Sequence, residues 1–134
     1  MSTLLELPTW QTTVIFLVNE DADSLAEFIN KNKKRLLESE IKELWEGFRD
    51  DNIDGQVNDF SKGGYYCMIK SPFAETCWAH EIFHVVNRIL TDRGVTHDAS
   101  AEPWAYLTGQ LTKVYLREVI PMVKEEIKER KKKK

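Results

Sequence analysis

The chain has 134 residues, of which 42% are hydrophobic and 31% charged, and its 19 Lys and Arg against 22 Asp and Glu give a net charge of −3. This length fits one domain, and an aromatic content of 10% with four Trp excludes a disordered chain. The mild net charge argues against a nucleic-acid-binding protein, so no nucleic-acid partner is expected.

Membrane, secreted and disulfide-rich classes are excluded next. The longest apolar run, Val14–Val18, is far shorter than the roughly 20 residues that span a bilayer, so no membrane span is expected. The N-terminal residues lack the basic and long apolar stretches of a secretory signal. Two cysteines, Cys67 and Cys77, are too few for a disulfide scaffold. We therefore expect a cytoplasmic protein.

The first half of the chain contains one strand and two helices. Thr12–Asn19 is rich in β-branched and apolar residues, which predicts a strand buried on both faces. A turn follows, and an apolar stripe of helical spacing begins at Leu25. A clearer stripe from Leu36 to Phe48 predicts a second helix that ends at Arg49.

The second half contains two strands and two further helices. Gln56–Phe60 and Tyr65–Lys70 are predicted strands joined by a turn at Gly63-Gly64. A helix is predicted from Ser71 as N-cap to Arg93, where Gly94 would stop it. The last helix is predicted from about Asp98 to Ile120. This order predicts an α+β fold with a small mixed or antiparallel sheet.

The end of the chain differs in composition from the rest. Residues 124–134 carry seven basic and three acidic side chains, a net charge of +4, which leaves −7 on residues 1–123. Such a run is usually a solvated, frayed terminus. We therefore expect a single domain over residues 1–123 and a charged, disordered tail over residues 124–134.

One motif carries chemistry: His80-Glu81-Ile82-Phe83-His84, an HExxH within the predicted Ser71–Arg93 helix. Imidazoles at i and i+4 lie one above the other on a helix and can bind one tetrahedral zinc. The glutamate after the first histidine can accept a proton from zinc-bound water. We therefore expect His80 and His84 to be zinc ligands and Glu81 to be the general base.

The position of the motif on its helix supports this interpretation. A helical wheel places the apolar residues of the helix, Phe83 included, on one arc, and His80, Glu81, His84 and Arg88 on the opposite arc. The histidine pair is therefore expected to face a cleft or solvent. Arg88 could bind an acidic group or form a surface ion pair, and Cys77 is expected to be a small, partly buried residue.

A catalytic zinc needs a third protein ligand and one open position. Glu102, eighteen residues after His84, is the first candidate. It shares a helix face with Tyr106 and Gly109, and the glycine would let a second helix approach closely. His97 is the main rival as a ligand, or could instead orient substrate or stabilise the oxyanion.

An HExxH helix followed by a glutamate eighteen residues later resembles the gluzincin clan of zinc metallopeptidases, and more narrowly its minimal, single-domain members. Short HExxH proteins of this shape are also encoded by phages and bacterial mobile elements. The similarity covers roughly residues 56 to 120, and its specific part is His80, Glu81, His84 and Glu102.

The resemblance implies a zincin-like domain in which a sheet, the active-site helix and the glutamate helix follow one another. Its edge strand, here Tyr65–Lys70, would hold an extended peptide or protein substrate by backbone hydrogen bonds. His80, His84 and Glu102 would be the ligands of one zinc ion, and Glu81 the general base. Large gluzincins often have a carboxylate four residues after the third ligand, where this chain has Tyr106.

We therefore expect an enzyme, a zinc metallopeptidase in which Tyr106 or His97 assists at the carbonyl oxygen. The alternative from another class is an inactive zinc-binding interaction module with four protein ligands, in which His97 or Cys77 completes the set. A third hypothesis is a metal-free helical adaptor.

Overall fold

The computed structural model describes residues 1–61, 63–95 and 102–132. In this part of the chain the strands form one sheet, in the order β1-β2-β4-β3. Its members are β1 (Ser2–Leu7), β2 (Thr12–Val18), β3 (Gly55–Asp59) and β4 (Tyr65–Ile69). The two central strands are parallel, and each edge strand is antiparallel to its neighbour. The sheet is therefore mixed, which confirms the predicted α+β class.

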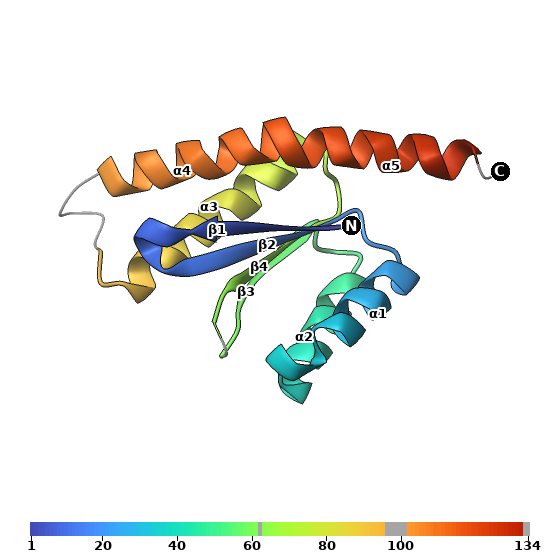
Figure 1. Cartoon of the computed structure of the whole chain (residues 1–134), viewed down its shortest axis with the longest axis horizontal. Helices are drawn as coiled ribbons and strands as arrows, with labels where there is room; N and C mark the ends of the chain where they lie inside the picture. Colours follow the sequence, from blue (N-terminus) through green and yellow to red (C-terminus); the bar gives the residue numbers. More distant parts are fainter. Residues whose placement is uncertain (62, 96–101, 133–134) are drawn as a thin grey trace.

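Helices cover both faces of this sheet, giving three layers (Figure 1). One face is covered by α1 (Ala22–Lys31) and α2 (Glu38–Arg49), and the other by α3 (Glu75–Asp92), α4 (Glu102–Val114) and α5 (Ile120–Lys132). Short 3-10 turns, η1 (Pro8–Trp10) and η2 (Lys33–Arg35), lie in the connections. None of the helices in the described ranges is both long and apolar enough for a membrane span.

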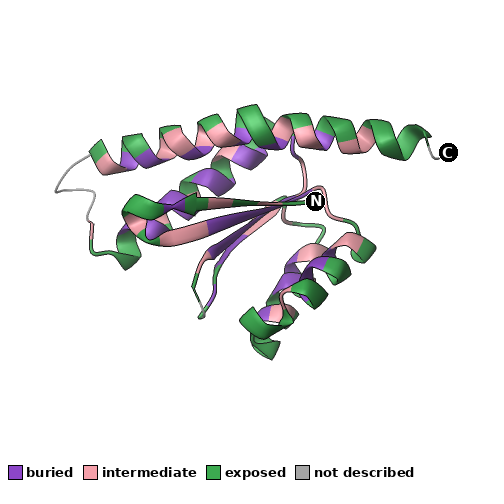
Figure 2. Cartoon of the chain, viewed as in Figure 1, coloured by how far each residue is buried: buried purple, intermediate pink, exposed green. Residues whose placement is uncertain are grey.

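The central strands supply the core on both sides. Side chains of β4 alternate between two clusters: Cys67 packs with α3, α4 and α5, whereas Tyr66 and Met68 pack with α1 and α2. Figure 2 shows the buried residues concentrated in the sheet and in α3, while the outer helices are exposed on one side. Continuous apolar runs in the sequence are explained by this position, because only interior strands are covered on both faces.

The edge strand β1 was not predicted. Its residues alternate between exposed and partly covered, and only Leu7 is fully buried. It pairs with β2 from Ser2 opposite Leu17 to Leu7 opposite Thr12. A short strand with one weakly apolar face gives little periodicity, and its pairing with β2 decides its conformation.

The helix that carries the motif begins later than predicted and ends where expected. Ser71 does not cap it; Ala74 N–H donates to the Ser71 carbonyl at 3.2 Å in a turn, and α3 begins at Glu75. Gly94 follows the helix with φ +75°, and Val95 N–H donates to the Leu90 carbonyl at 2.9 Å. Glycine is favoured at such a stop because it adopts positive φ without strain.

The expected end of the last helix and the disordered tail are corrected by the structure. The π-helical segment η3 (Tyr115–Val119) joins α4 to α5, so one long helix continues to Lys132 (Figure 1). Ile120 N–H donates to the Tyr115 carbonyl, and this wider turn makes room for Pro121 within the helix. Val123 is fully buried and anchors α5 to the core.

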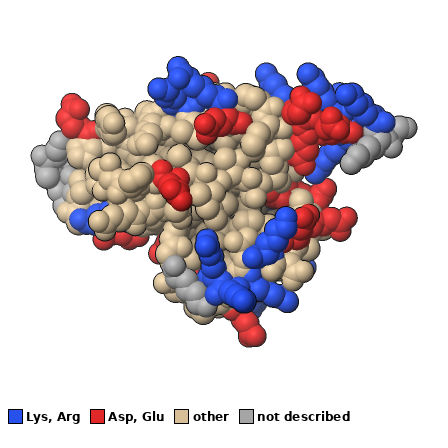
Figure 3. Space-filling model, viewed as in Figure 1, with Lys and Arg blue, Asp and Glu red and all other residues tan. Residues whose placement is uncertain are grey.

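Charged side chains gather toward the end of α5. Figure 3 shows basic and acidic side chains side by side there, and a second mixed group around α1 and α2. The positive charge of the last residues therefore lies beside acidic groups.

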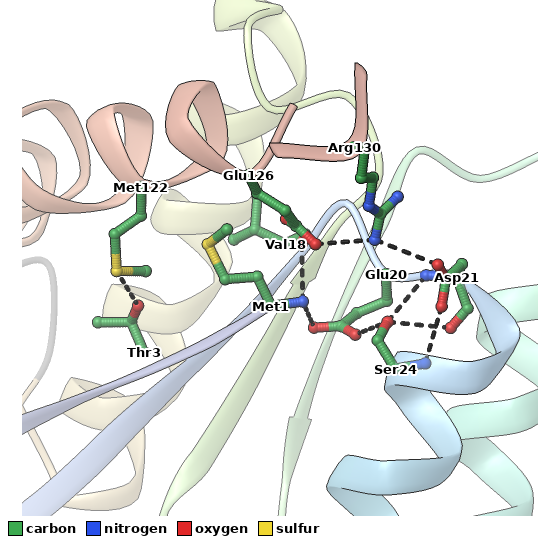
Figure 4. Close-up of polar contacts among 9 residues, drawn as sticks. All are labelled: Met1, Thr3, Val18, Glu20, Asp21, Ser24, Met122, Glu126 and Arg130. Carbon is green, nitrogen blue, oxygen red and sulfur yellow. Dashed lines mark hydrogen bonds and ion pairs between the residues drawn. The ribbon is translucent and has the colours of Figure 1, made fainter. Parts of the chain in front are cut away.

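A polar cluster joins the end of α5 to the start of α1 and to β1 (Figure 4). Arg130 contacts Glu126 at 2.7 Å and Asp21 at 3.1 Å. The amine of Met1 is paired with the buried carboxylate of Glu20, which also accepts a hydrogen bond from the Ser24 hydroxyl. The cluster therefore connects residues from both ends of the sequence.

Asp21 caps α1, and its contribution to stability is expected to depend on pH. Its carboxylate accepts from Ser24 N–H at 2.7 Å. This bond, opposed by partial desolvation and helped by the Ser24 hydroxyl and Arg130, lowers the pKa of Asp21. Because the pKa of Asp21 is lower in the folded than in the unfolded state, the carboxylate stabilises the fold at pH values above its unfolded-state pKa of about 4. This stabilisation is lost as the pH falls through the folded-state pKa.

We expect Asp21→Ala to reduce the free energy of unfolding by about 1 kcal/mol at pH 7 and by less at pH 3. Asp21→Asn, which keeps a capping oxygen, is the control and should cost less at pH 7. Urea unfolding at both pH values measures this. A destabilisation by Asp21→Ala that is the same at pH 3 and pH 7 would contradict the assignment.

Candidate functional site

The two histidines of the motif lie together on α3. Their Nε2 atoms are 2.9 Å apart and their ring centroids 4.5 Å apart. His80 is exposed and His84 is partly buried. Desolvation, followed by the charges of His80 and Arg88, lowers the pKa of His84. The neutral imidazole, which is the metal-binding form, is therefore favoured.

Glu81 is more buried than the wheel predicted, with only 7% of its surface exposed. It packs against Gly55 at the start of β3, where a Cβ atom would lie 2.5 Å from Cγ of Glu81. Burial raises the pKa of the Glu81 carboxyl; the charge of His80 opposes this and that of Asp54 adds to it. The missing side chain at Gly55 therefore provides the space for the carboxylate beside the histidines.

The motif faces β3, and this corrects the expected edge strand. A groove of about 270 Å³ is lined by Gly55, Gln56, Val57, His80, Glu81, His84 and Arg88. The strand Tyr65–Lys70 was expected along the cleft, but β4 is paired with β2 on one side and with β3 on the other. Its uninterrupted apolar sequence suits this interior position. The edge strand beside the motif is therefore β3.

Both cysteines are buried, and Cys77 lies one turn before His80 on α3. Cys77 borders a hollow of about 290 Å³ with Asp54, His80 and Glu81, and its thiol donates to the Asp54 carbonyl at 3.2 Å. Burial raises the pKa of the Cys77 thiol and raises that of Cys67 further. Its burial and its hydrogen bond to the Asp54 carbonyl are consistent with the small, partly buried residue expected at Cys77.

Within the described residues, no third potential metal ligand lies close enough to the two histidines to share a metal ion with them. Across residues 1–61, 63–95 and 102–132, no three His, Cys, Asp or Glu side chains are close enough to hold a metal ion. Glu102 is the first residue of α4 and is exposed. His97 and Asp98 lie outside the described residues. Which of Glu102 and His97 is the third ligand stays a prediction.

The face of α4 that carries Glu102 also carries Tyr106, which is 73% exposed, and Gly109. A Cβ atom at Gly109 would have nothing within 4 Å, so the close helix approach expected at this glycine is wrong. The packing instead uses the opposite stripe, in which Trp104, Leu107 and Leu111 are buried. Tyr106 stays a predicted assisting residue that does not line the groove described here.

The separation of the two imidazole nitrogens can be compared with the separation that a zinc ion requires. Two nitrogens bound to one tetrahedral zinc at about 2.0–2.1 Å lie roughly 3.4 Å apart. The observed separation of 2.9 Å is close to this value. At 2.9 Å the two nitrogens are at hydrogen-bond distance from each other, and they would have to move apart by about 0.5 Å to share a zinc ion.

Two contacts of the site could not be predicted from the sequence. Gly55 precedes the predicted strand Gln56–Phe60 and was given no role in the site, although its contact with Glu81 decides where the carboxylate lies. Arg88 forms an ion pair with Asp59 at the end of β3. The position of Arg88 one turn after His84 indicated from the sequence that it lies near the motif. Its pairing with Asp59 could not be predicted, because it depends on the position of β3 at the edge of the sheet.

Compared with family models, with curated proteins and with solved structures, the chain matches none of them. Its function therefore has to be inferred from the residues of the groove and from their geometry.

Proposed function

We propose that the groove between α3 and β3 is the active site of a zinc-dependent hydrolase that cleaves peptide bonds. The observation that supports this most is the convergence of the His80 and His84 Nε2 atoms, 2.9 Å apart. Glu81 lies beside them in the same groove with its carboxyl pKa raised by burial. The proximity of a histidine pair and a carboxylate in one groove supports the proposal, because a metallopeptidase needs metal ligands beside a general base.

In this proposal His80 and His84 hold the zinc, with Glu102 or His97 as third ligand. Bound zinc would supply a Lewis acid for the substrate carbonyl and make water easier to deprotonate. Glu81 accepts a proton from water as the water oxygen bonds to the carbonyl carbon. When the C–N bond breaks, Glu81 returns this proton to the leaving amine.

The position of β3 supports a peptide as substrate. In the described sheet β3 is an edge strand, so its outer backbone groups are available for pairing. An extended peptide can add to such an edge by backbone hydrogen bonds. The groove lies between this strand and the histidines, which would place a backbone carbonyl beside His80 and His84.

Zinc titration of the purified full chain by calorimetry tests the proposal. We expect the wild-type chain to bind one zinc ion, and His80→Ala and His84→Ala each to weaken binding by at least about 100-fold. Glu102→Ala and His97→Ala identify the third ligand, since one of them should weaken binding comparably. Wild-type affinity in the His84→Ala variant would refute the site.

A further inference from the structure

The groove extends past the histidines to a charged pair. Arg88 lines the groove one helical turn after His84, on the same face of α3. Its Nη1 atom contacts one carboxylate oxygen of Asp59, the last residue of β3. Both side chains are about half exposed, 46% for Arg88 and 55% for Asp59. An ion pair this exposed contributes little to stability, so a second anion can compete for the guanidinium.

The strand and the helix run in the same direction along the groove. Gly55 at the start of β3 lies against Glu81, and Asp59 at its end lies against Arg88. Four helical residues advance about 6 Å, and two residues of an extended chain about 6.8 Å. A peptide lying along β3 would therefore bring a group about two residues from the cleaved bond to Arg88.

A second, separate cavity borders Asp59. It has a volume of about 730 Å³, and Asp59 lines it together with Phe60, Gly64, Tyr65, Asp92 and Arg93. Asp59 thus lies between this cavity and the histidine groove. The cavity and the histidine groove share no lining residue.

The charges favour an acidic group at Arg88. Among the described residues that line the groove, Arg88 is the one Lys or Arg side chain. The contact recorded with Asp59 uses a single nitrogen of the guanidinium. Because a guanidinium has five N–H donors in a fork that matches a carboxylate, it can bind a second carboxylate bidentately.

We propose that Arg88 binds a carboxylate of the substrate about two residues from the cleaved bond, which makes acidic peptides the substrate class. The inference rests on the proposed function, because it assigns the groove to a peptide substrate. The carboxylate comes either from an Asp or Glu side chain or from the C-terminus of the peptide, and both present the same group to Arg88.

The test uses the full chain with Glu81→Gln, loaded with zinc, so that peptides bind without turnover. Fluorescein-labelled hexapeptides of neutral composition carry one Asp or one Asn at each position in turn, with an amidated or a free C-terminus. We expect one Asp position, or the free C-terminus, to strengthen binding about tenfold in fluorescence anisotropy. Comparison of the amidated and free series distinguishes the two sources of the carboxylate.

Arg88→Gln, added to this chain, should abolish the preference, whereas Arg117→Gln is the matched control. Arg117 is an exposed arginine of η3 outside the groove, so its variant should keep the preference. Asp59→Asn removes the competing carboxylate and should strengthen binding of the acidic peptide several-fold. A purely structural ion pair would give no such gain, so this variant separates the two roles.

Equal binding of Asp and Asn peptides at every position, together with equal binding of both C-termini, would overturn the proposal. A preference that survives Arg88→Gln would overturn it as well. Zinc content measured on the same samples separates this failure from that of the proposed function. Zinc bound without an acidic preference refutes only the role of Arg88. If the samples contain no zinc, the proposed hydrolase is refuted. A preference for the acidic peptide that Arg88→Gln abolishes would still support a carboxylate-binding site at Arg88.

Discussion

Glu81→Gln is expected to lower the rate of peptide hydrolysis by at least about 100-fold and to leave zinc affinity unchanged, because a general base contributes factors of this size. Glutamine has nearly the same shape as glutamate, so the contact with Gly55 is kept. It cannot accept the proton of the attacking water. The change therefore removes the base while the ligand pair stays in place.

Cleavage of a mixed peptide library, followed by mass spectrometry, measures the loss. Glu75→Gln is the matched control, since it removes the same charge from the first turn of the same helix, outside the groove. It should retain wild-type turnover. Undiminished hydrolysis by the Glu81→Gln variant would rule out Glu81 as the base.

Ile82→Ala is expected to lower the free energy of unfolding by about 2–5 kcal/mol, and Phe83→Ala by less than about 1 kcal/mol. The two residues are neighbours within the motif, and each is replaced by alanine. Ile82 is 1% exposed in the core beneath α3, whereas Phe83 is 50% exposed. The smaller side chain should therefore cause the larger loss.

Urea unfolding of both variants with the wild-type chain gives this comparison, and it reports how α3 is rotated about its axis. The orientation that buries Ile82 is also the one that turns the histidines toward β3. A larger loss for Phe83→Ala would mean that α3 presents a different face to the sheet. The groove described above would then be wrong.

The sequence predicted the elements whose periodicity is strong. The strands beginning near Thr12, Gln56 and Tyr65 were placed within about one residue, as boundaries of this kind allow. The stop at Gly94 was also predicted, because it depends on local conformation. Features that depend on strand pairing were missed. The strand β1 has only weak alternation of apolar and polar residues, and the edge position of β3 follows from the order of strands in the sheet, which no local sequence pattern contains.

The geometry of the candidate site was predictable only in part, for the same reason. The spacing of His80 and His84 on one helix is local, and the structure brings their nitrogens together. The burial of Glu81 depends on Gly55, twenty-six positions earlier in the chain, and could not be seen on a helical wheel. Likewise the last helix was predicted to end at Ile120, although the π turn before Pro121 lets the helix continue.

Anomalous diffraction at the zinc edge, from crystals grown without added metal, tests the central claim most directly. We expect one peak bound by His80 and His84, with a third protein ligand and one position left open for water. A peak with four protein ligands would contradict the hydrolase and favour an inactive zinc-binding module. No peak, with both histidines in solvent, would contradict the zinc site itself.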